Sequence, residues 1–449
     1  MTERNRIYLC LAHMSEAGLE QKYIKEAFDT NWVVPLGPNV NGFEDDLKKF
    51  VTCANVISTE VERSLDDARD DKAVPELVEG KEVVALASGT SAVHLALIAC
   101  GVKPGDEVIV QSFTFCASSH PITYLGATPV FVDSEKDTWN MDSELMEEAI
   151  KDRIAKTGKK PKAIIPVALY GMPYKIDRIM EIANKYEIPV IEDAAEGFGS
   201  RYNGQVLGTF GKYGVLSFNG NKMITTSGGG ALITPDKDSW REIMMYATQY
   251  RESYPYYQHE KIGYNYRMSN ICAGIGRGQM TVVNDHIAHH KHVQALYEEL
   301  LKDVKGITVH SQPTLRQAQG PVYDSNYWLC TITIDPDVKV KGQENAYKEI
   351  VTGAVGGAAG VIHAASSATT DCQPNDNVEA MRVALDKANI EARPVWKPMH
   401  KQPCYKDAPA YVNGVSEAIF KVGMCLPAGP CVSDDDVRYI VENIKASIL

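Results

Sequence analysis

Between residues 82 and 193 the sequence alternates short apolar runs, typical of β-strands, with longer segments whose apolar residues recur at helical spacing. The expected strands are 82–87, 107–111, 129–133, 163–169 and 189–193, and the expected helices are 90–100, 114–125, 141–154 and 176–187. Strands joined through helices of this length pair in parallel and are covered on both faces. The alternation therefore predicts an α/β fold whose large domain holds a mostly parallel sheet between helices.

The flanking segments predict further helices and a smaller second domain. Helical patches at 23–29 and 43–50 precede the alternation, and 269–301 is expected to form one or two long helices after an aromatic-rich loop at 251–266. A strand at 327–334, a helix at 378–388 and a strand at 392–395 follow. We expect an N-terminal segment and large domain over 1–285 and a small α+β domain over 286–449, with insertions at 58–80, 312–322 and 347–374.

Composition disfavours several classes of function. The 449 residues carry a net charge of −12 and no concentrated basic run, which disfavours a nucleic-acid partner because phosphates need a basic surface. No apolar run has the length of a membrane span, and the N-terminus lacks the pattern of a signal peptide. The ten cysteines include no CxxC pair, so neither a zinc site nor a disulfide framework is indicated, and a cytoplasmic location is expected.

Lys222 lies on a turn-rich loop between two expected strands, 215–218 and 230–234. Three consecutive glycines at 228–230 let the backbone pass close to a bulky group or adopt positive φ. A lysine on such a loop is either a Schiff-base nucleophile or a solvated surface residue. Because most lysines are solvated, this stretch by itself favours the surface interpretation.

Three polar or aromatic features follow expected strands, at the sheet edge where α/β proteins bind ligands. The Ser88-Gly-Thr-Ser91 turn opens a helix, so it either binds a phosphate or is a plain N-cap. Asp193 either pairs with a protonated ring nitrogen or caps the next segment. Phe113 and Phe115 either stack on a flat ligand or belong to the core.

Two further patterns look like ligand sites but do not predict one. His286 and His290 have the i, i+4 spacing of metal ligands, but no other ligand is evident, so we expect a solvated helix face and no metal site. The run 208–212 resembles a phosphate loop, but it lacks the GxxxxGK[ST] spacing.

Taken together, the motifs resemble the sugar aminotransferases of the DegT/DnrJ/StrS family, which are pyridoxal-phosphate (PLP) enzymes with the aspartate-aminotransferase fold, fold type I. The resemblance covers nearly the whole chain. The matching stretches are 87–97, 105–115, 129–133, Val190-Ile-Glu-Asp-Ala-Ala195, Ser217-Phe-Asn-Gly-Asn-Lys222, Gly263-Tyr-Asn-Tyr-Arg-Met-Ser269, Arg393-Pro-Val-Trp-Lys-Pro-Met-His400 and Leu426-Pro-Ala-Gly429.

The resemblance implies a role for each matching residue. Lys222 would bind PLP covalently and act as the catalytic acid and base, while Asp193 would hold the ring nitrogen. The phosphate would be held by Gly89, Thr90 and Ser217, the ring would stack on Phe115, and Asn265 would reach the phosphate of the neighbouring subunit. Such sharing implies a homodimer.

Two parts of the implied site are less regular. Glu196 stands near the cofactor where family members often have Gln or His. The resemblance also implies that Trp32, Trp396, Lys397 and His400 contact a nucleotide sugar. The alternative is a packed Trp396 beside a solvated Lys397.

The implied reaction moves an amino group from an amino acid, expected to be L-glutamate, to a nucleotide-linked 4-keto-6-deoxy sugar for surface glycan or polysaccharide biosynthesis. Lys222 argues against the branch of the family that has histidine there and deoxygenates sugars. The Trp-Lys-Pro-Met-His run most resembles enzymes that aminate UDP-4-keto-6-deoxy-N-acetylhexosamines in bacillosamine-type pathways. The alternatives are a 3-keto sugar or keto-cyclitol substrate, a PLP-binding regulator without turnover, and a general nucleotide-binding α/β protein.

Overall fold

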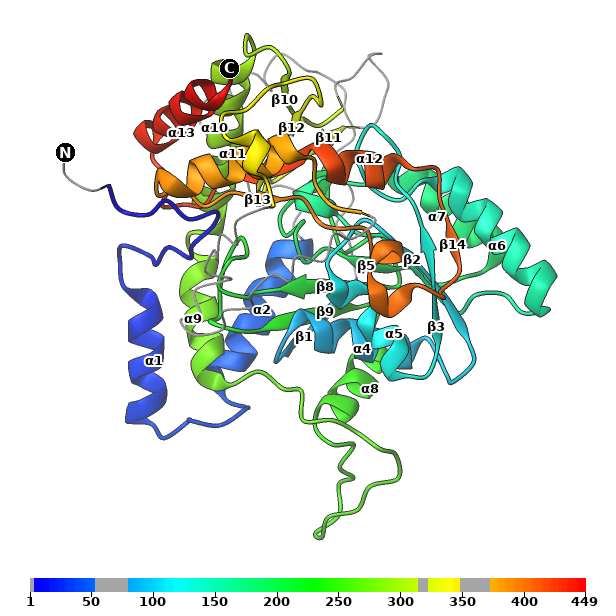
Figure 1. The fold of residues 1–449 in the computed structure, drawn as a ribbon. Coiled ribbons are helices and arrows are strands. Elements are labelled where there is room, and N and C mark those ends of the chain that lie inside the picture. Colours follow the sequence, from blue (N-terminus) through cyan, green and yellow to red (C-terminus); the bar gives the residue numbers. More distant parts are fainter. Residues whose placement is uncertain (1–3, 53–79, 314–321, 348–371) are drawn as a thin grey trace, which may run out of the picture.

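The computed structural model describes residues 4–52, 80–313, 322–347 and 372–449 (Figure 1). The insertions predicted at 58–80, 312–322 and 347–374 fall almost entirely outside these ranges. Within them, no helix is long and apolar enough to cross a membrane.

Two four-stranded sheets form the centre of the large domain, with strand orders β14-β3-β2-β4 and β5-β8-β9-β1. Parallel bridges from Ile164 to Val190 and from Val167 to Asp193 join them edge to edge between β4 and β5. The strands are β1 (Glu82–Leu86), β2 (Glu107–Gln111), β3 (Thr128–Val132), β4 (Ile164–Ile165), β5 (Ile191–Asp193), β8 (Tyr213–Ser217), β9 (Gly230–Thr234) and β14 (Ala410–Tyr411).

This sheet confirms the predicted mostly parallel architecture. The pairs of β2 with β3 and β4, of β3 with β14, and of β5 with β8 are all parallel. Strand β9 pairs antiparallel with both β1 and β8, so it runs opposite to the other described strands of the sheet. As a result, the start of β9 lies beside the carboxyl ends of β1 and β8.

Helices cover the sheet on both sides (Figure 1). They are α4 (Gly89–Ala99), α5 (His120–Tyr124), α6 (Ser143–Thr157), α7 (Ile176–Tyr186) and α8 (Lys237–Ala247). The helix predicted at 114–125 is wrong in part: a 3-10 turn at Cys116–Ser118 precedes the short α5, which has Pro121 in its first turn. Proline has no N–H to donate, so it starts a new helix rather than continuing one.

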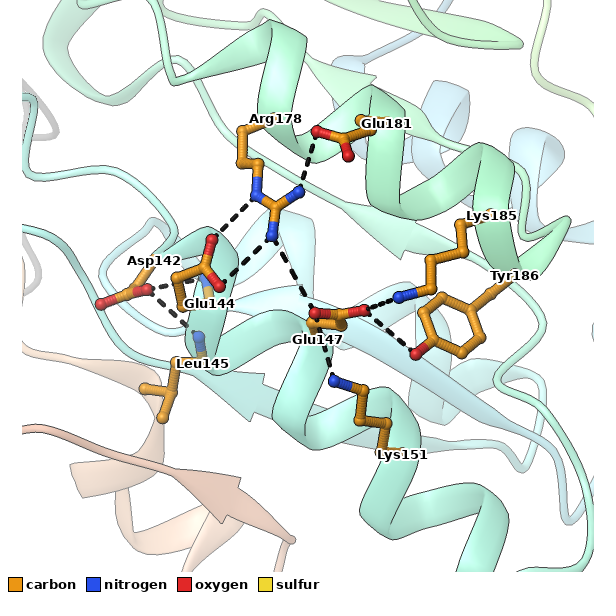
Figure 2. A network of polar contacts seen from close by, with 9 residues as sticks. All are labelled: Asp142, Glu144, Leu145, Glu147, Lys151, Arg178, Glu181, Lys185 and Tyr186. Atoms are coloured by element: carbon orange, nitrogen blue, oxygen red, sulfur yellow. Dashed lines mark hydrogen bonds and ion pairs between the residues drawn. The ribbon is translucent and has the colours of Figure 1, made fainter.

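Side-chain contacts join α6 to α7 on the outside of the domain, as Figure 2 shows. The Arg178 guanidinium donates to Glu144 at 2.8 Å and to Glu181 at 2.8 Å. Glu147 accepts hydrogen bonds from Lys185 and from the Tyr186 hydroxyl. The network fixes the spacing of two helices that pack side by side at the edge of the sheet.

The N-terminal helices α1 (Leu19–Asp29) and α2 (Pro38–Thr52) pack on α9 (Asn270–Met280). Their close approach depends on glycines of α9, since a Cβ at Gly278 would lie 2.6 Å from the backbone nitrogen of Glu20. Before α9, the chain leaves the body as a projecting loop over 251–263 (Figure 1). Tyr254, Tyr256, Tyr257 and Ile262 are exposed on this loop.

The C-terminal part forms a second, antiparallel sheet of order β10-β12-β15-β13. Its strands are β10 (Ile307–Val309), β12 (Cys330–Ile334), β13 (Arg393–Pro394) and β15 (Gly423–Leu426). The helices α10 (Val283–Leu301), α11 (Asp376–Lys387), α12 (Val415–Val422) and α13 (Asp434–Ser447) accompany it, and short strands β6 (Arg201–Tyr202), β7 (Gln205–Val206) and β11 (Tyr323–Asp324) make a separate sheet.

This second unit has its own hydrophobic core, which includes Ile332, Met381 and Ile440. Ile7 of the N-terminal segment also belongs to that core, whereas β14 from the C-terminal part belongs to the large sheet. The chain therefore crosses between the two units at both ends. The domain division after residue 285 stays a prediction.

Candidate active site

A cavity of about 250 Å³ opens at the carboxyl ends of β1, β5 and β8. It brings together residues from segments that are far apart in the sequence. The predicted site residues that line it are Gly89, Thr90, Phe115, Asp193, Glu196, Ser217, Lys222 and Trp396.

Lys222 lies on the loop between β8 and β9, and the loop is folded back on itself by backbone hydrogen bonds. The Phe218 N–H donates to the Gly229 carbonyl at 2.9 Å, and the Thr226 N–H donates to the Phe218 carbonyl at 2.9 Å. The Lys222 side chain is only 13% exposed, so the surface interpretation of this lysine is wrong. Its Nζ lies 3.7 Å from Glu196 Oε1 and 4.1 Å from the centre of the Trp328 ring.

The N-terminus of α4 forms one end of the cavity. Ser88 is the N-cap, and its hydroxyl accepts a hydrogen bond from the Ser91 N–H at 3.1 Å. Gly89 and Thr90 follow and line the cavity, as does Ser217 at the end of β8. Backbone approach is close, because a Cβ at Gly230 would lie 2.4 Å from the Gly89 nitrogen. The N-cap and anion-site interpretations are therefore compatible. Ser88 caps the helix, while Gly89 and Thr90 of its first turn line the cavity together with Ser217.

Asp193 ends β5 with its carboxylate in the cavity wall. The Ser118 hydroxyl donates to Oδ2 at 2.6 Å, and the Ala195 N–H donates to Oδ1 at 3.1 Å. Burial raises the pKa of Asp193, while the two donors and the charge of Lys222 act in the opposite direction. A buried carboxylate with only neutral donors in contact is suited to hold a cation.

Glu196 is a second buried carboxylate in the same wall. It accepts hydrogen bonds from the Tyr170 N–H at 2.7 Å and from the Trp396 indole N–H at 3.3 Å. Burial raises the pKa of Glu196, and the nearby charge of Lys222 opposes this shift. The Tyr170 ring lies between the rings of Trp328 and Trp396, with ring centres 6.3 Å apart on each side.

Four predicted site residues do not line this cavity in their own chain. Asn265 is exposed, and its backbone pairs with Thr248. Trp32 is 40% exposed, and Lys397 is half-buried outside the cavity. His400 contacts Ser112 Oγ through Nδ1 at 2.6 Å and Glu417 through Nε2 at 3.2 Å, so both of its ring nitrogens are engaged.

The structure adds Tyr170, Trp328 and Ser118 to the cavity and its walls. Trp328 was visible only as an aromatic residue at the start of a predicted strand. Ser118 fell within a predicted helix, but the chain forms a 3-10 turn at this point. Tyr170 has φ 53°, a left-handed backbone conformation that no sequence pattern at this position indicates.

The histidine pair and the run 208–212 both have structural roles. His286 and His290 are buried by tertiary packing and not solvated as predicted, and their Nδ1 atoms contact the carbonyls of Met223 and Tyr327. No cluster of three potential metal ligands occurs among the residues the structure describes. The run 208–212 does bind an anion through its N–H groups, but that anion is the Glu192 carboxylate.

The donors of the cavity match the chemistry of PLP. Helix N–H groups and hydroxyls suit a phosphate, the Asp193 carboxylate suits a protonated ring nitrogen, and the Lys222 amine suits an aldehyde. Phe115 is 47% exposed at the cavity and can face a flat ring, whereas Phe113 is buried in the core.

Comparison with known proteins gives a family match over most of the chain. The sequence profile of the DegT/DnrJ/EryC1/StrS aminotransferase family matches residues 69–351 and 347–445. The putative pyridoxal phosphate-dependent aminotransferase EpsN of Bacillus subtilis strain 168 is 38% identical over 441 residues, which cover 97% of this chain and 94% of that protein.

Two further relatives agree with this match. GDP-perosamine synthase of Escherichia coli O157:H7 is 31% identical over 438 residues, covering 98% of each protein. The crystal structure of a DegT DnrJ EryC1 StrS aminotransferase from Brucella abortus superposes with a TM-score of 0.74 at 25% identity, covering 96% of this chain and 95% of that one.

Proposed function

The chain belongs to the DegT/DnrJ/EryC1/StrS aminotransferase family of PLP-dependent enzymes, and on that premise we propose that it transfers an amino group from L-glutamate to a nucleotide-linked 4-keto-6-deoxy sugar. The observation that carries the proposal is the cavity that Lys222, Asp193 and the N-terminus of α4 share. The family match confirms two expectations from the sequence, namely the DegT/DnrJ/StrS family and the PLP cofactor.

Each part of the cavity has a distinct task in this proposal. Gly89, Thr90 and Ser217 would hold the phosphate of PLP, and Phe115 would pack on its ring. Asp193 keeps a positive charge on the ring nitrogen, and Ser118 and Ala195 hold the carboxylate in place for that task. Bound there, PLP supplies an electron sink for the charge left behind when a proton leaves the donor carbon.

Lys222 acts as nucleophile, acid and base. With PLP bound, Lys222 would hold it covalently through Nζ. Once the amino group of the donor takes its place, Nζ would be free to take up the proton that leaves the donor carbon. The position of Lys222 supports this role, because its side chain is only 13% exposed and lies in the cavity with Asp193 and Glu196.

We assign Asn265 to the active site of a second subunit in a homodimer. Two observations support this assignment. Asn265 is exposed and does not line the cavity of its own chain. The adjoining loop, 251–263, carries the exposed apolar side chains Tyr254, Tyr256, Tyr257 and Ile262, which a second copy would cover. The same proposal includes a cytoplasmic location.

The finer substrate assignment is a UDP-linked 4-keto-6-deoxy-N-acetylhexosamine, as in bacillosamine-type pathways. It rests on the Trp396-Lys-Pro-Met-His400 run, of which Trp396 reaches the cavity and lies 5.3 Å from the Phe115 ring. The second candidate is a GDP-linked keto sugar, which the likeness to GDP-perosamine synthases favours. Trp32, Lys397 and His400 are assigned to the nucleotide sugar with Trp396.

A panel of keto sugars tests this proposal. The protein is first converted to its amine-loaded form with L-glutamate and is then offered UDP-linked and GDP-linked 4-keto sugars and a UDP-linked 3-keto sugar. We expect amination of the UDP-linked 4-keto sugar, detected by mass spectrometry, together with recovery of the visible absorbance of PLP. Preference for another sugar would overturn the finer assignment, and no amination of any sugar would overturn the function.

A further inference from the structure

The ammonium group of Lys222 lies between a carboxylate and an aromatic face. Nζ is 3.7 Å from Glu196 Oε1 and 4.1 Å from the centre of the Trp328 ring. The Glu196 side chain is only 4% exposed, so its charge acts on Lys222 with little screening by solvent. A carboxylate and an indole face both attract an ammonium group.

Both partners of Lys222 are held by other groups. The Tyr170 N–H donates to Glu196 Oε2 and the Trp396 indole N–H donates to Oε1, so Trp396 holds the same oxygen that lies 3.7 Å from Lys222 Nζ. The Trp328 indole N–H donates to the Asn221 carbonyl at 2.6 Å, and the Tyr170 ring stacks against its ring. The arrangement is therefore fixed independently of Lys222 and does not form around it.

The Glu196 carboxylate gives the Tyr170 N–H and the Trp396 indole N–H an acceptor oxygen each. A glutamine would keep one acceptor oxygen and place an NH2 group at the other position, although burial of a neutral amide costs less than burial of a carboxylate. Besides the second acceptor, glutamate brings a negative charge. The cationic group that faces this charge in the structure is Lys222.

We propose that Glu196 and Trp328 form a holding site for the free side chain of Lys222, occupied whenever its amine is not bound to cofactor. The proposal rests on the proposed function, because an aminotransferase releases and recaptures this lysine in every cycle. Glu196 and Trp328 are positioning residues in this account. They keep the amine inside the cavity, close to the atoms between which it moves protons.

The test uses the cofactor-free protein and amine labelling. Lys222 is labelled with limiting acetic anhydride at neutral pH, and its labelling rate is measured by peptide mass spectrometry relative to Lys81. Lys81 is a suitable reference because it is half-buried and bonded to the Gly211 carbonyl, away from Glu196. Acylation needs an amine that is released from its contacts, so a lysine held between Glu196 and Trp328 is labelled slowly.

Glu196→Gln keeps the shape of the side chain and one of its two acceptor oxygens, and it removes the charge. We expect the Lys222/Lys81 labelling ratio to rise about tenfold in this variant. Trp328→Phe retains an aromatic face that attracts cations less strongly, and we expect a rise of about twofold. Asp193 also acts on Lys222 through its charge and remains in both variants, so the labelling is not expected to reach that of an exposed lysine.

An unchanged ratio in Glu196→Gln would overturn the proposal. If Glu196→Gln does not fold, as judged by circular dichroism, an unchanged ratio in Trp328→Phe overturns it instead. Failure of the proposed function would appear in the keto-sugar panel and not in the labelling. Labelling needs no substrate, and the panel uses only the unsubstituted protein. A raised ratio without amination of any sugar would leave the lysine site intact and remove the transferase assignment.

Discussion

The Ser118 hydroxyl donates a 2.6 Å hydrogen bond to Asp193 Oδ2, although 75 residues separate the two in sequence. The contact links the 3-10 turn after β2 to the carboxyl end of β5. It fixes the carboxylate that we assign to the cofactor ring nitrogen. Its removal should therefore affect activity through Asp193 without removing the charge.

Substitutions at both residues test this relationship. Asp193→Asn should fold but lose at least about a hundredfold in kcat, because a neutral amide cannot keep the ring nitrogen protonated. Ser118→Ala should lower kcat/KM about tenfold, the usual effect of losing a hydrogen bond to a charged group. Ser119→Ala is the matched control, since that hydroxyl donates to the Cys116 carbonyl instead. Near-native turnover by Asp193→Asn would contradict the assignment.

Mixed dimers test the assignment of Asn265. Lys222→Ala and Asn265→Ala subunits, each inactive alone, should regain activity when mixed, because one site of a mixed dimer has both residues intact. Activity is measured with glutamate and the keto sugar after subunit exchange. Mixing Lys222→Ala with the double variant Lys222→Ala/Asn265→Ala is the control and should give none. Confirmed mixed dimers without activity would argue against shared sites.

The two half-reactions separate a binding role of Lys397 from a structural one. Lys397→Ala should lower kcat/KM for the nucleotide sugar at least about tenfold, because a charge-assisted contact to the diphosphate is lost, and should leave the half-reaction with glutamate unchanged. Lys401→Ala serves as the control, since Lys401 lies 3.2 Å from Glu417. Equal damage to both half-reactions would assign Lys397 a structural role.

Much of the fold and site was predictable because it depends on local sequence patterns. The strand–helix alternation predicted the parallel sheet, and the turn-rich stretch around Lys222 predicted a loop between β8 and β9. Asp193 was placed correctly because a strand's carboxyl end is set by the apolar run before it.

The remaining features depend on contacts between distant segments. Trp328 reaches the cavity from beyond α10. Tyr170 contacts Glu196 behind the cavity wall and has a positive φ that its neighbours in sequence do not require. His286 and His290 have a spacing compatible with a solvated helix face, but tertiary packing buries that face. Burial lowers the pKa of His290 to about 3, so it is neutral in the core.

The network in Figure 2 predicts a pH dependence of stability. The hydrogen bond from Lys185 is the largest influence that lowers the pKa of Glu147, to about 2 from an ordinary value of 4.5. A depressed carboxyl pKa stabilises the folded state above the unfolded value, and this stabilisation is lost as the pH falls from 4.5 toward 2.

Glu147→Gln should therefore unfold at lower urea than the unsubstituted protein at neutral pH, and the difference should shrink below pH 4.5. The neighbouring exposed Glu148 provides the control substitution Glu148→Gln, for which we expect a smaller change. A difference between the Glu147→Gln and unsubstituted midpoints that stays constant with pH would show that the carboxylate charge is not what joins α6 to α7.

The central claim is that Lys222 binds the cofactor covalently, and reductive trapping tests it most directly. The protein loaded with PLP is reduced with sodium borohydride, digested and mapped by mass spectrometry, with Lys222→Ala treated in parallel. We expect the pyridoxyl group on Lys222, and we expect Lys222→Ala to show neither this label nor the visible absorbance of lysine-bound PLP. A pyridoxyl group on a different lysine, or a normal visible band in Lys222→Ala, would contradict the account.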